Sequence, residues 1–156
     1  MARVACFDSN IVGWAIRRDA TSGQEDNILK ARALFKTCKE KNIKILIPAI
    51  AFGEVLCPIS LEQQKDFGLL MMKEYLITPF DAQCAMEFAK LWREKSDSQN
   101  QEVSRKMKTD YMILATAIAK KADVLYTEDR KLQRFAGDYI RTEGLPGYTM
   151  QTSLDI

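Results

Sequence analysis

Four acidic residues in apolar surroundings are the part of this sequence that could carry out chemistry. Asp8 ends the first apolar run of the chain, and Asp129 follows a later apolar run in the same way. Glu54 and Asp110 instead lie within segments that have helical periodicity. Each acid also has a simple structural explanation: helix capping for Asp8 and Asp129, solvent exposure for Glu54, and a salt bridge or cap for Asp110.

The helical segment 103–121 predicts the direction of one of these acids. At about 100° per residue, one apolar stripe about 60° wide contains Val103, Met107, Leu114 and Ile118. Asp110 projects within about 20° of Val103, on the same side as the stripe. An ionised carboxylate on a core-facing surface costs several kcal/mol unless it is paired or binds a metal. The periodicity leaves a paired acid and a functional acid equally open.

The elements that must position these acids alternate along the chain. Apolar runs predict strands at 4–7, 43–47, 75–78, 124–127 and 139–142. Helical patterns predict a short helix with Ser9 as N-cap and longer ones at 25–41, 49–56, 61–73, 81–92, 103–121 and 129–135. The polar segment 94–102 is expected to be a loop. This alternation predicts a single α/β domain over 1–156, with helices on both faces of a parallel sheet.

Composition narrows the chemistry that the chain can perform. The 156 residues include no histidine, which excludes Ser-His-Asp and Cys-His catalysis and most zinc sites. The net charge of +2 means that any site for a polyanion must come from a local patch. Four cysteines without a CxxC pair predict buried free thiols in a reducing compartment. Because we find neither a signal peptide nor a membrane-length apolar run, we expect a cytoplasmic protein.

The predicted topology brings the four acids to one place. Asp8 and Asp129 converge if the first and fourth strands are neighbours where the strand order reverses, which is where open α/β sheets bind ligands. Right-handed crossovers place Glu54 and Asp110 on helices beside these strands. Carboxylates this close together stay ionised only around cations, and oxygen ligands suit Mg²⁺ or Mn²⁺. We therefore predict a site for one or two such ions, where a bound water attacks a phosphoryl group.

Taken in order, the acidic motifs resemble those of a PIN domain, and in particular the VapC-type toxins of prokaryotic toxin–antitoxin pairs. The matching residues are Asp8-Ser9-Asn10, Glu54, Asp110 and Thr127-Glu128-Asp129. The resemblance runs from 4 to about 142 and implies a three-layer α/β/α sandwich around a central parallel sheet of four to five strands. It also implies an Mg²⁺- or Mn²⁺-dependent endoribonuclease with an RNA substrate, an antitoxin partner and a homodimeric state.

The resemblance also assigns roles to individual residues. It implies that the four acids are both the catalytic and the metal-binding residues, with Asn10 and Thr127 orienting the carboxylates or the attacking water. Glu128 stays open between contacting a second ion and facing solvent. The alternative function is a catalytically silent PIN-like module that binds RNA or protein, and the presence of all four acids argues against it.

Basic residues near the acids are candidates for phosphate contacts. Arg105 and Lys108 precede Asp110 on the same predicted helix, and we expect these two to bind the RNA backbone. Weaker candidates on the flanking segments are Lys95, Lys106, Arg130, Lys131 and Arg134. For each of these cations the simple alternative is a solvated position on a helix surface.

Overall fold

A five-stranded parallel sheet positions the site. The computed structural model describes residues 3–17, 22–99 and 105–147. The strands are β1 (Val4–Phe7), β2 (Lys44–Pro48), β3 (Leu76–Thr78), β4 (Val124–Tyr126) and β5 (Thr142–Glu143), and their order is β3-β2-β1-β4-β5. All neighbouring pairs are parallel. The strand order therefore reverses at β1, and the predicted adjacency of the first and fourth strands is confirmed.

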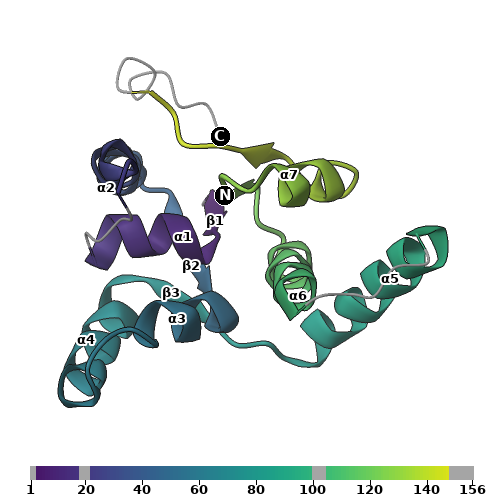
Figure 1. Cartoon of the computed structure of the whole chain (residues 1–156), viewed down its shortest axis with the longest axis horizontal. Coiled ribbons are helices and arrows are strands. Elements are labelled where there is room, and N and C mark those ends of the chain that lie inside the picture. The colour runs from purple at the N-terminus through teal and green to yellow at the C-terminus, as the bar shows by residue number, and fades with distance from the viewer. Residues whose placement is uncertain (1–2, 18–21, 100–104, 148–156) are drawn as a thin grey trace.

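Helices cover both faces of the sheet, as the sequence predicts for a three-layer α/β/α fold. They are α1 (Ser9–Val12) with the π-helical turn η1 (Gly13–Arg17), α2 (Glu25–Glu40), α3 (Ala49–Leu56), α4 (Leu61–Glu74), α5 (Ala82–Gln99), α6 (Arg105–Ala119) and α7 (Arg130–Ala136). Figure 1 shows α1 and α2 on one side of the sheet and α5 and α6 on the other. Among the described helices, none has the length and apolarity needed to cross a membrane.

The core lies between the central strands and the helices packed on them. Phe7 of β1 stacks on Tyr126 of β4 at 5.1 Å between ring centroids, and its other close aromatic neighbour is Phe35 of α2 at 4.7 Å. Both central strands are almost completely buried. Such continuous apolar strands are typical of a parallel sheet that is covered on both faces. The ends of β1 and β4 are therefore rigid places from which to project polar side chains.

Helix α6 is buried around more of its circumference than the predicted narrow stripe. Residues 113–117 are all buried, whereas Met107 and Ile118 of the predicted stripe are only half-buried, and Val103 lies outside the described residues. The reason is that α5 packs along α6 and covers the side that faces away from the sheet. A helix enclosed between two layers has apolar residues around most of its circumference. Asp110 is half-buried and lies in the N-terminal half of α6, before the fully buried stretch 113–117.

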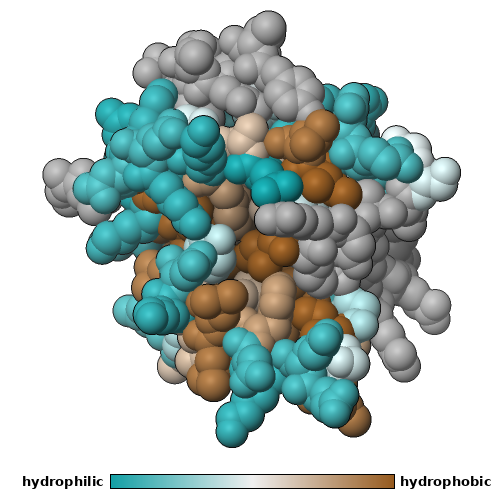
Figure 2. Space-filling view, turned by 90° about the vertical axis from the view of Figure 1, so that its left-hand side faces the viewer, coloured by the Kyte–Doolittle hydropathy of each residue, from teal (hydrophilic) through white to brown (hydrophobic). Residues whose placement is uncertain are grey.

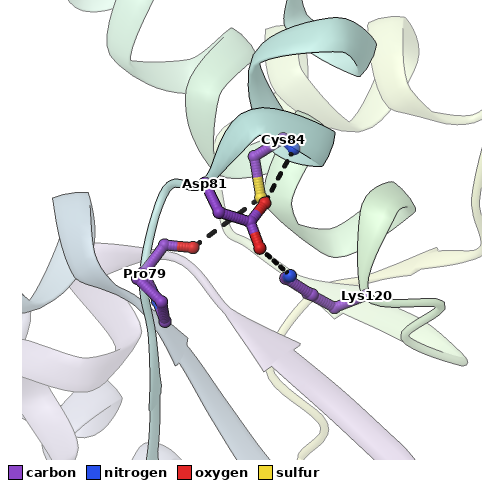
Figure 3. A network of polar contacts seen from close by, with 4 residues as sticks. All are labelled: Pro79, Asp81, Cys84 and Lys120. Carbon is purple, nitrogen blue, oxygen red and sulfur yellow. Dashed lines mark hydrogen bonds and ion pairs between the residues drawn. The ribbon is translucent and has the colours of Figure 1, made fainter.

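A polar network ties the start of α5 to the end of α6 (Figure 3). The Asp81 carboxylate accepts hydrogen bonds from the backbone N–H of Cys84 at 3.1 Å and from the Lys120 ammonium. The hydrogen bond from Lys120 is the largest of the effects that lower the pKa of Asp81 to about 2. The Asp81 carboxylate thus caps the first turn of α5 and also joins the two helices.

Three sequence predictions about local structure are wrong. Helix α5 continues to Gln99, so the expected loop 94–102 is helical over 94–99, while 100–102 lie outside the described residues. Contacts with the segment that follows α7 hold this polar stretch, because Glu94 accepts a hydrogen bond from the Tyr139 hydroxyl. The side chain that caps α1 is Asp8 rather than Ser9. Cys57 is exposed beyond the end of α3, whereas Cys6, Cys38 and Cys84 are buried free thiols as expected.

Two of the predicted strands end elsewhere. Pro48 was expected to close β2 but belongs to it, paired with Thr78 as the last residue of the strand. This position tolerates proline because a strand end demands no further ladder bond from its missing N–H. The fifth strand covers only Thr142–Glu143 rather than 139–142. The backbone N–H groups of Tyr139 and Ile140 bond to the carbonyl of Ala136, so this stretch turns at the end of α7.

Candidate active site

Asp8 is a buried carboxyl group at the junction of β1 and α1. Its Oδ1 accepts a hydrogen bond from the backbone N–H of Ser9 at 2.7 Å, and its Oδ2 accepts one from the Thr127 hydroxyl at 2.8 Å. Only 6% of the residue is exposed. Burial is the largest effect on its pKa, which is raised; the charge of Asp129 raises it further, and the two hydrogen bonds oppose the shift. Ionised Asp8 is therefore costly unless positive charge lies nearby.

Thr127 joins Asp8 to the second strand-end acid. The fully buried Thr127 hydroxyl donates to Asp8 and accepts a hydrogen bond from the backbone N–H of Asp129 at 3.1 Å. The Asp129 side chain caps α7 by accepting bonds from the N–H groups of Lys131 at 2.9 Å and Leu132 at 3.2 Å. The end of β4 thus presents one hydroxyl and one carboxylate that are both fixed relative to Asp8.

Glu54 approaches Asp8 from helix α3, which packs on α1. The residue is exposed, but partial burial of its carboxyl group is the largest cause of a raised pKa. The negative charge of Asp8 adds to this shift, and a hydrogen bond with the Ser9 side chain opposes it. The residue is thus exposed, as expected, but its carboxyl group is also partly buried beside Asp8. Glu54 faces solvent and also senses the charge of the buried acid.

Asp110 faces an open pocket of about 1040 Å³ together with Asn10 and Asp129. The other lining residues come mainly from α5, α6 and α7 and the segments that precede α2 and α7; they are Trp14, Gln24, Asn27, Lys95, Met107, Tyr111, Glu128, Arg130, Lys131, Leu132, Arg134 and Phe135. Asp8 and Glu54 do not line this pocket. The acids thus form two groups, one around the buried Asp8 and one at the pocket. Asp129 belongs to both, because it lines the pocket and its charge acts on Asp8.

The four predicted acids therefore surround one end of the sheet in two overlapping groups. In the part of the chain that the structure describes, no three Asp, Glu or Cys side chains form a ready-made metal cluster. The donor set that is present consists of carboxylate, amide and hydroxyl oxygens, which suits hard cations such as Mg²⁺ and Mn²⁺. A metal site at Asp8, Glu54, Asp110 and Asp129 thus stays a prediction.

Of the two stronger candidates for phosphate contacts, Lys108 does not line the pocket, whereas four of the weaker candidates do. The Lys108 ammonium lies 5.6 Å from the centre of the Trp92 ring, away from the pocket lining. Arg105 begins α6, and its side chain is outside the described residues. The cations that do line the pocket are Lys95, Arg130, Lys131 and Arg134. Their signal in the sequence is that three of them follow Asp129 within the first turns of one helix.

Two residues that hold the end of β4 in place had weak or no sequence signal. The Gln133 side-chain amide donates to the Thr127 carbonyl at 2.7 Å, which braces the turn between Thr127 and Asp129. Glu128, whose role was open, accepts a hydrogen bond from the backbone N–H of Leu145 at 2.6 Å and also lines the pocket. Glu128 therefore anchors the segment that follows β5. Neither interaction follows from periodicity, because each depends on a neighbour that the turn brings close.

A comparison with models of known families decides the family. The model described as "PIN domain" matches residues 5–138 of this chain. The chain belongs to the PIN domain family. The four acids, Asn10 and Thr127 all lie within the matched residues of this PIN domain. Membership supports a nuclease at the level of the family. No curated protein matches the sequence.

Solved structures share the fold of this PIN domain at low sequence identity. VapBC2 from Rickettsia felis, bound to a DNA fragment from their promoter, is 19% identical with a TM-score of 0.64, covering 92% of this chain and 99% of that one. DNA-bound VapBC from Salmonella typhimurium is 18% identical with a TM-score of 0.66, covering 94% and 100%. VapBC-1 from nontypeable Haemophilus influenzae is 15% identical with a TM-score of 0.65, covering 91% and 98%. These likenesses establish the fold over nearly the whole chain.

Proposed function

We propose that this PIN domain is a metal-dependent endoribonuclease that hydrolyses RNA phosphodiester bonds at Asp8, Glu54, Asp110 and Asp129. The observation that carries the proposal is the environment of Asp8. It is a buried acid with a raised pKa, tied through Thr127 to Asp129 and approached by Glu54. Acids that raise one another's pKa are ionised together at neutral pH when a cation lies between them.

The chain's own residues divide the work of such a site. A bound Mg²⁺ or Mn²⁺ ion supplies an activated water and stabilises charge on the phosphoryl oxygens. The four carboxylates would hold the ion, and hydrogen bonds from Ser9 and Thr127 fix both carboxylate oxygens of Asp8. Thr127 keeps Asp8 and the backbone of Asp129 in register, while Asn10 offers an amide at the pocket wall. No step requires a histidine, and the chain has none.

The substrate side of the proposal rests on the cations of α7. Arg130, Lys131 and Arg134 line the same pocket as Asp110 and Asp129, and none of the three forms an ion pair with another described residue. Cations whose charge is not already neutralised attract phosphates, and such contacts position a nucleic-acid backbone. We propose that these three bind the phosphates beside the scissile bond, with Arg105 and Lys108 farther along the strand.

A protein partner is the second part of the proposal. Figure 2 shows apolar side chains gathered in the middle and lower part of the face that carries α1, α2 and α4, with polar side chains around them. The large apolar side chains exposed on these elements and on β3 are Leu29, Leu61, Leu69, Leu70, Met72 and Leu76. Contiguous exposed apolar surface usually marks an interaction site. Because similar folds occur in VapBC complexes, we propose a cytoplasmic VapC-like toxin, a homodimer with an antitoxin partner.

A cleavage assay with one matched pair of variants tests the enzyme. The purified protein should cut single-stranded RNA with Mg²⁺ or Mn²⁺ and stop when EDTA is added. Asp110→Asn should lower the rate by about 100-fold or more, as loss of one group that stabilises developing charge does in other enzymes. The control is Asp66→Asn, which removes an exposed acid from α4 and should cut like the parent.

The outcomes separate the two candidate functions. Equal rates for Asp110→Asn and the parent would contradict the assignment of the site. A parent protein that binds RNA with and without metal but never cuts it would instead support the catalytically silent module.

A further inference from the structure

A ladder of aromatic rings runs from α5 across α6 to α7 and ends at the pocket. Phe88 and Trp92 lie 5.7 Å apart, Trp92 and Tyr111 6.0 Å, and Tyr111 and Phe135 4.5 Å with an interplanar angle of 20°. The last pair is stacked, and both of its rings line the same pocket as Asp110 and Asp129. The pocket therefore has a flat aromatic wall beside its carboxylates.

A lysine lies over this wall. The Lys95 ammonium is 4.9 Å from the centre of the Phe135 ring and 5.9 Å from that of Tyr139, and 3.5 Å from a carboxylate oxygen of Asp138. About a quarter of the Lys95 side chain is exposed. Phe135 is half-buried, so part of the ring that bears the cation is open to the pocket. The quadrupole of an aromatic ring attracts a cation that lies over its face, so this contact helps to hold the Lys95 ammonium at the pocket.

These observations place three kinds of group around one pocket. The pocket is lined by the acids Asp110 and Asp129, by the cations of α7, and by the stacked rings together with Lys95. A nucleotide offers a matching set, because its phosphate pairs with cations and its base stacks on aromatic side chains. A base held in a duplex is already stacked on its neighbours and presents only its edges, so a ring wall favours unpaired bases.

We propose that Phe135, backed by Tyr111 and flanked by Lys95, is a stacking subsite for one unpaired RNA base next to the bond that is cut. The inference rests on the proposed ribonuclease function and adds to it a binding subsite for one base of the RNA. The incoming base takes the face of Phe135 that carries the Lys95 ammonium, and the displaced ammonium pairs with the adjoining phosphate. Phe135 is thus a binding residue that touches substrate, whereas Tyr111 supports it from behind.

The test compares two RNAs and three variants. One RNA is a single-stranded oligonucleotide with a mapped cleavage position, and the other carries an abasic ribose at the nucleotide on the 5′ or the 3′ side of that position. For the intact RNA, Phe135→Leu should lower kcat/KM about 10-fold, the size expected when one base loses its aromatic platform. Phe135→Tyr should cut like the parent. Phe88→Leu, which alters the same ladder outside the pocket, is the matched control and should also cut like the parent.

The abasic RNA distinguishes stacking from a change in the fold. The parent should cut it about 10-fold more slowly than the intact RNA, and Phe135→Leu should cause no further loss. A loss for Phe135→Leu that is equal on both RNAs, or a parent that cuts both equally fast, would overturn the subsite while leaving the nuclease in place. A parent that cuts no RNA with either metal would overturn the proposed function itself, and the subsite with it.

Discussion

The acids at the strand ends and the acids on the helices are positioned in different ways. The Asp8 side chain accepts three hydrogen bonds and the Asp129 side chain two, and each acid caps the helix that follows it. Glu54 and Asp110 lie within α3 and α6, where the backbone N–H groups are already used by the helix itself. Asp8 and Asp129 therefore help to hold the strand ends and the following helices in place, whereas Glu54 and Asp110 project from helices that form without them. Removing either acid of the first pair takes away a helix cap and should lower stability as well as activity, whereas neither acid of the second pair caps a helix.

The largest effect that would sharpen this comparison is expected at Thr127. Thr127→Val keeps the shape of the side chain but removes the hydroxyl that joins Asp8 to the backbone of Asp129. We expect cleavage to fall about 10- to 100-fold, the range found when groups that orient metal ligands are removed. Thr127→Ser keeps the hydroxyl and should recover most of the rate. Equal rates for the Val and Ser variants would show that the link between the strand ends is not needed.

A smaller effect is expected on the free energy of unfolding, which should fall more when Asp129 is replaced than when Asp110 is. Asp129→Ala removes the cap of α7 and should lower the free energy of unfolding by about 1 kcal/mol, while Asp129→Asn, which still caps, should lose much less. Asp110→Ala removes no helix cap, because Asp110 lies inside α6, and should therefore cost less stability than Asp129→Ala. Urea unfolding of the three variants measures the difference. A larger loss at Asp110 than at Asp129 would reverse the comparison.

The smallest expected effect is the change of stability with pH, and its sign follows from the raised pKa of Asp8. Below the usual pKa of an aspartic acid, about 4, the carboxyl is protonated in both the folded and unfolded states. As the pH rises from there through the higher folded pKa, the unfolded state loses its proton first, so stability falls. Asp8→Asn keeps the cap and lacks the titration.

The unfolding free energy of the parent should therefore decline relative to that of Asp8→Asn between about pH 4 and neutrality in EDTA. Thermal unfolding across this pH range measures it. Added Mg²⁺ should restore the parent at pH 7 and leave the variant unchanged, because binding to the folded state alone stabilises it. A parent that gains stability relative to the variant over the same range would contradict the raised pKa.

The strands and the longer helices could be predicted because their signals are local. The apolar run before Asp8 and the one before Asp129 mark buried parallel strands, and neighbouring strand ends then bring the acids together. What failed depends on contacts between distant segments. The composition of 94–99 suggests a loop, yet Tyr139 and the rings near Lys95 hold it as a helix. Tertiary contacts of this kind override local preference.

The candidate site was predictable to the same extent. Residue types and strand ends indicated the acids, and resemblance added Thr127, which the structure joins to Asp8 by a hydrogen bond. Gln133 was missed because an amide that braces a carbonyl six residues earlier has no distinctive pattern. Phe135 was read as one more residue of a short helix, since nothing in the sequence tells which rings of a ladder face a pocket.

The hydrogen bond from Thr127 to Asp8 joins residues 119 positions apart. During synthesis the ribosome releases the first strand long before its neighbour β4 exists, so the hydrogen bond between Asp8 and Thr127 forms only after residues 124–127 have emerged. Until then Asp8 lacks Thr127, Asp129 and the adjacent strand. A partly translated chain that ends before β4 cannot pair the two strand ends, so the candidate site is assembled only after β4 has folded onto β1.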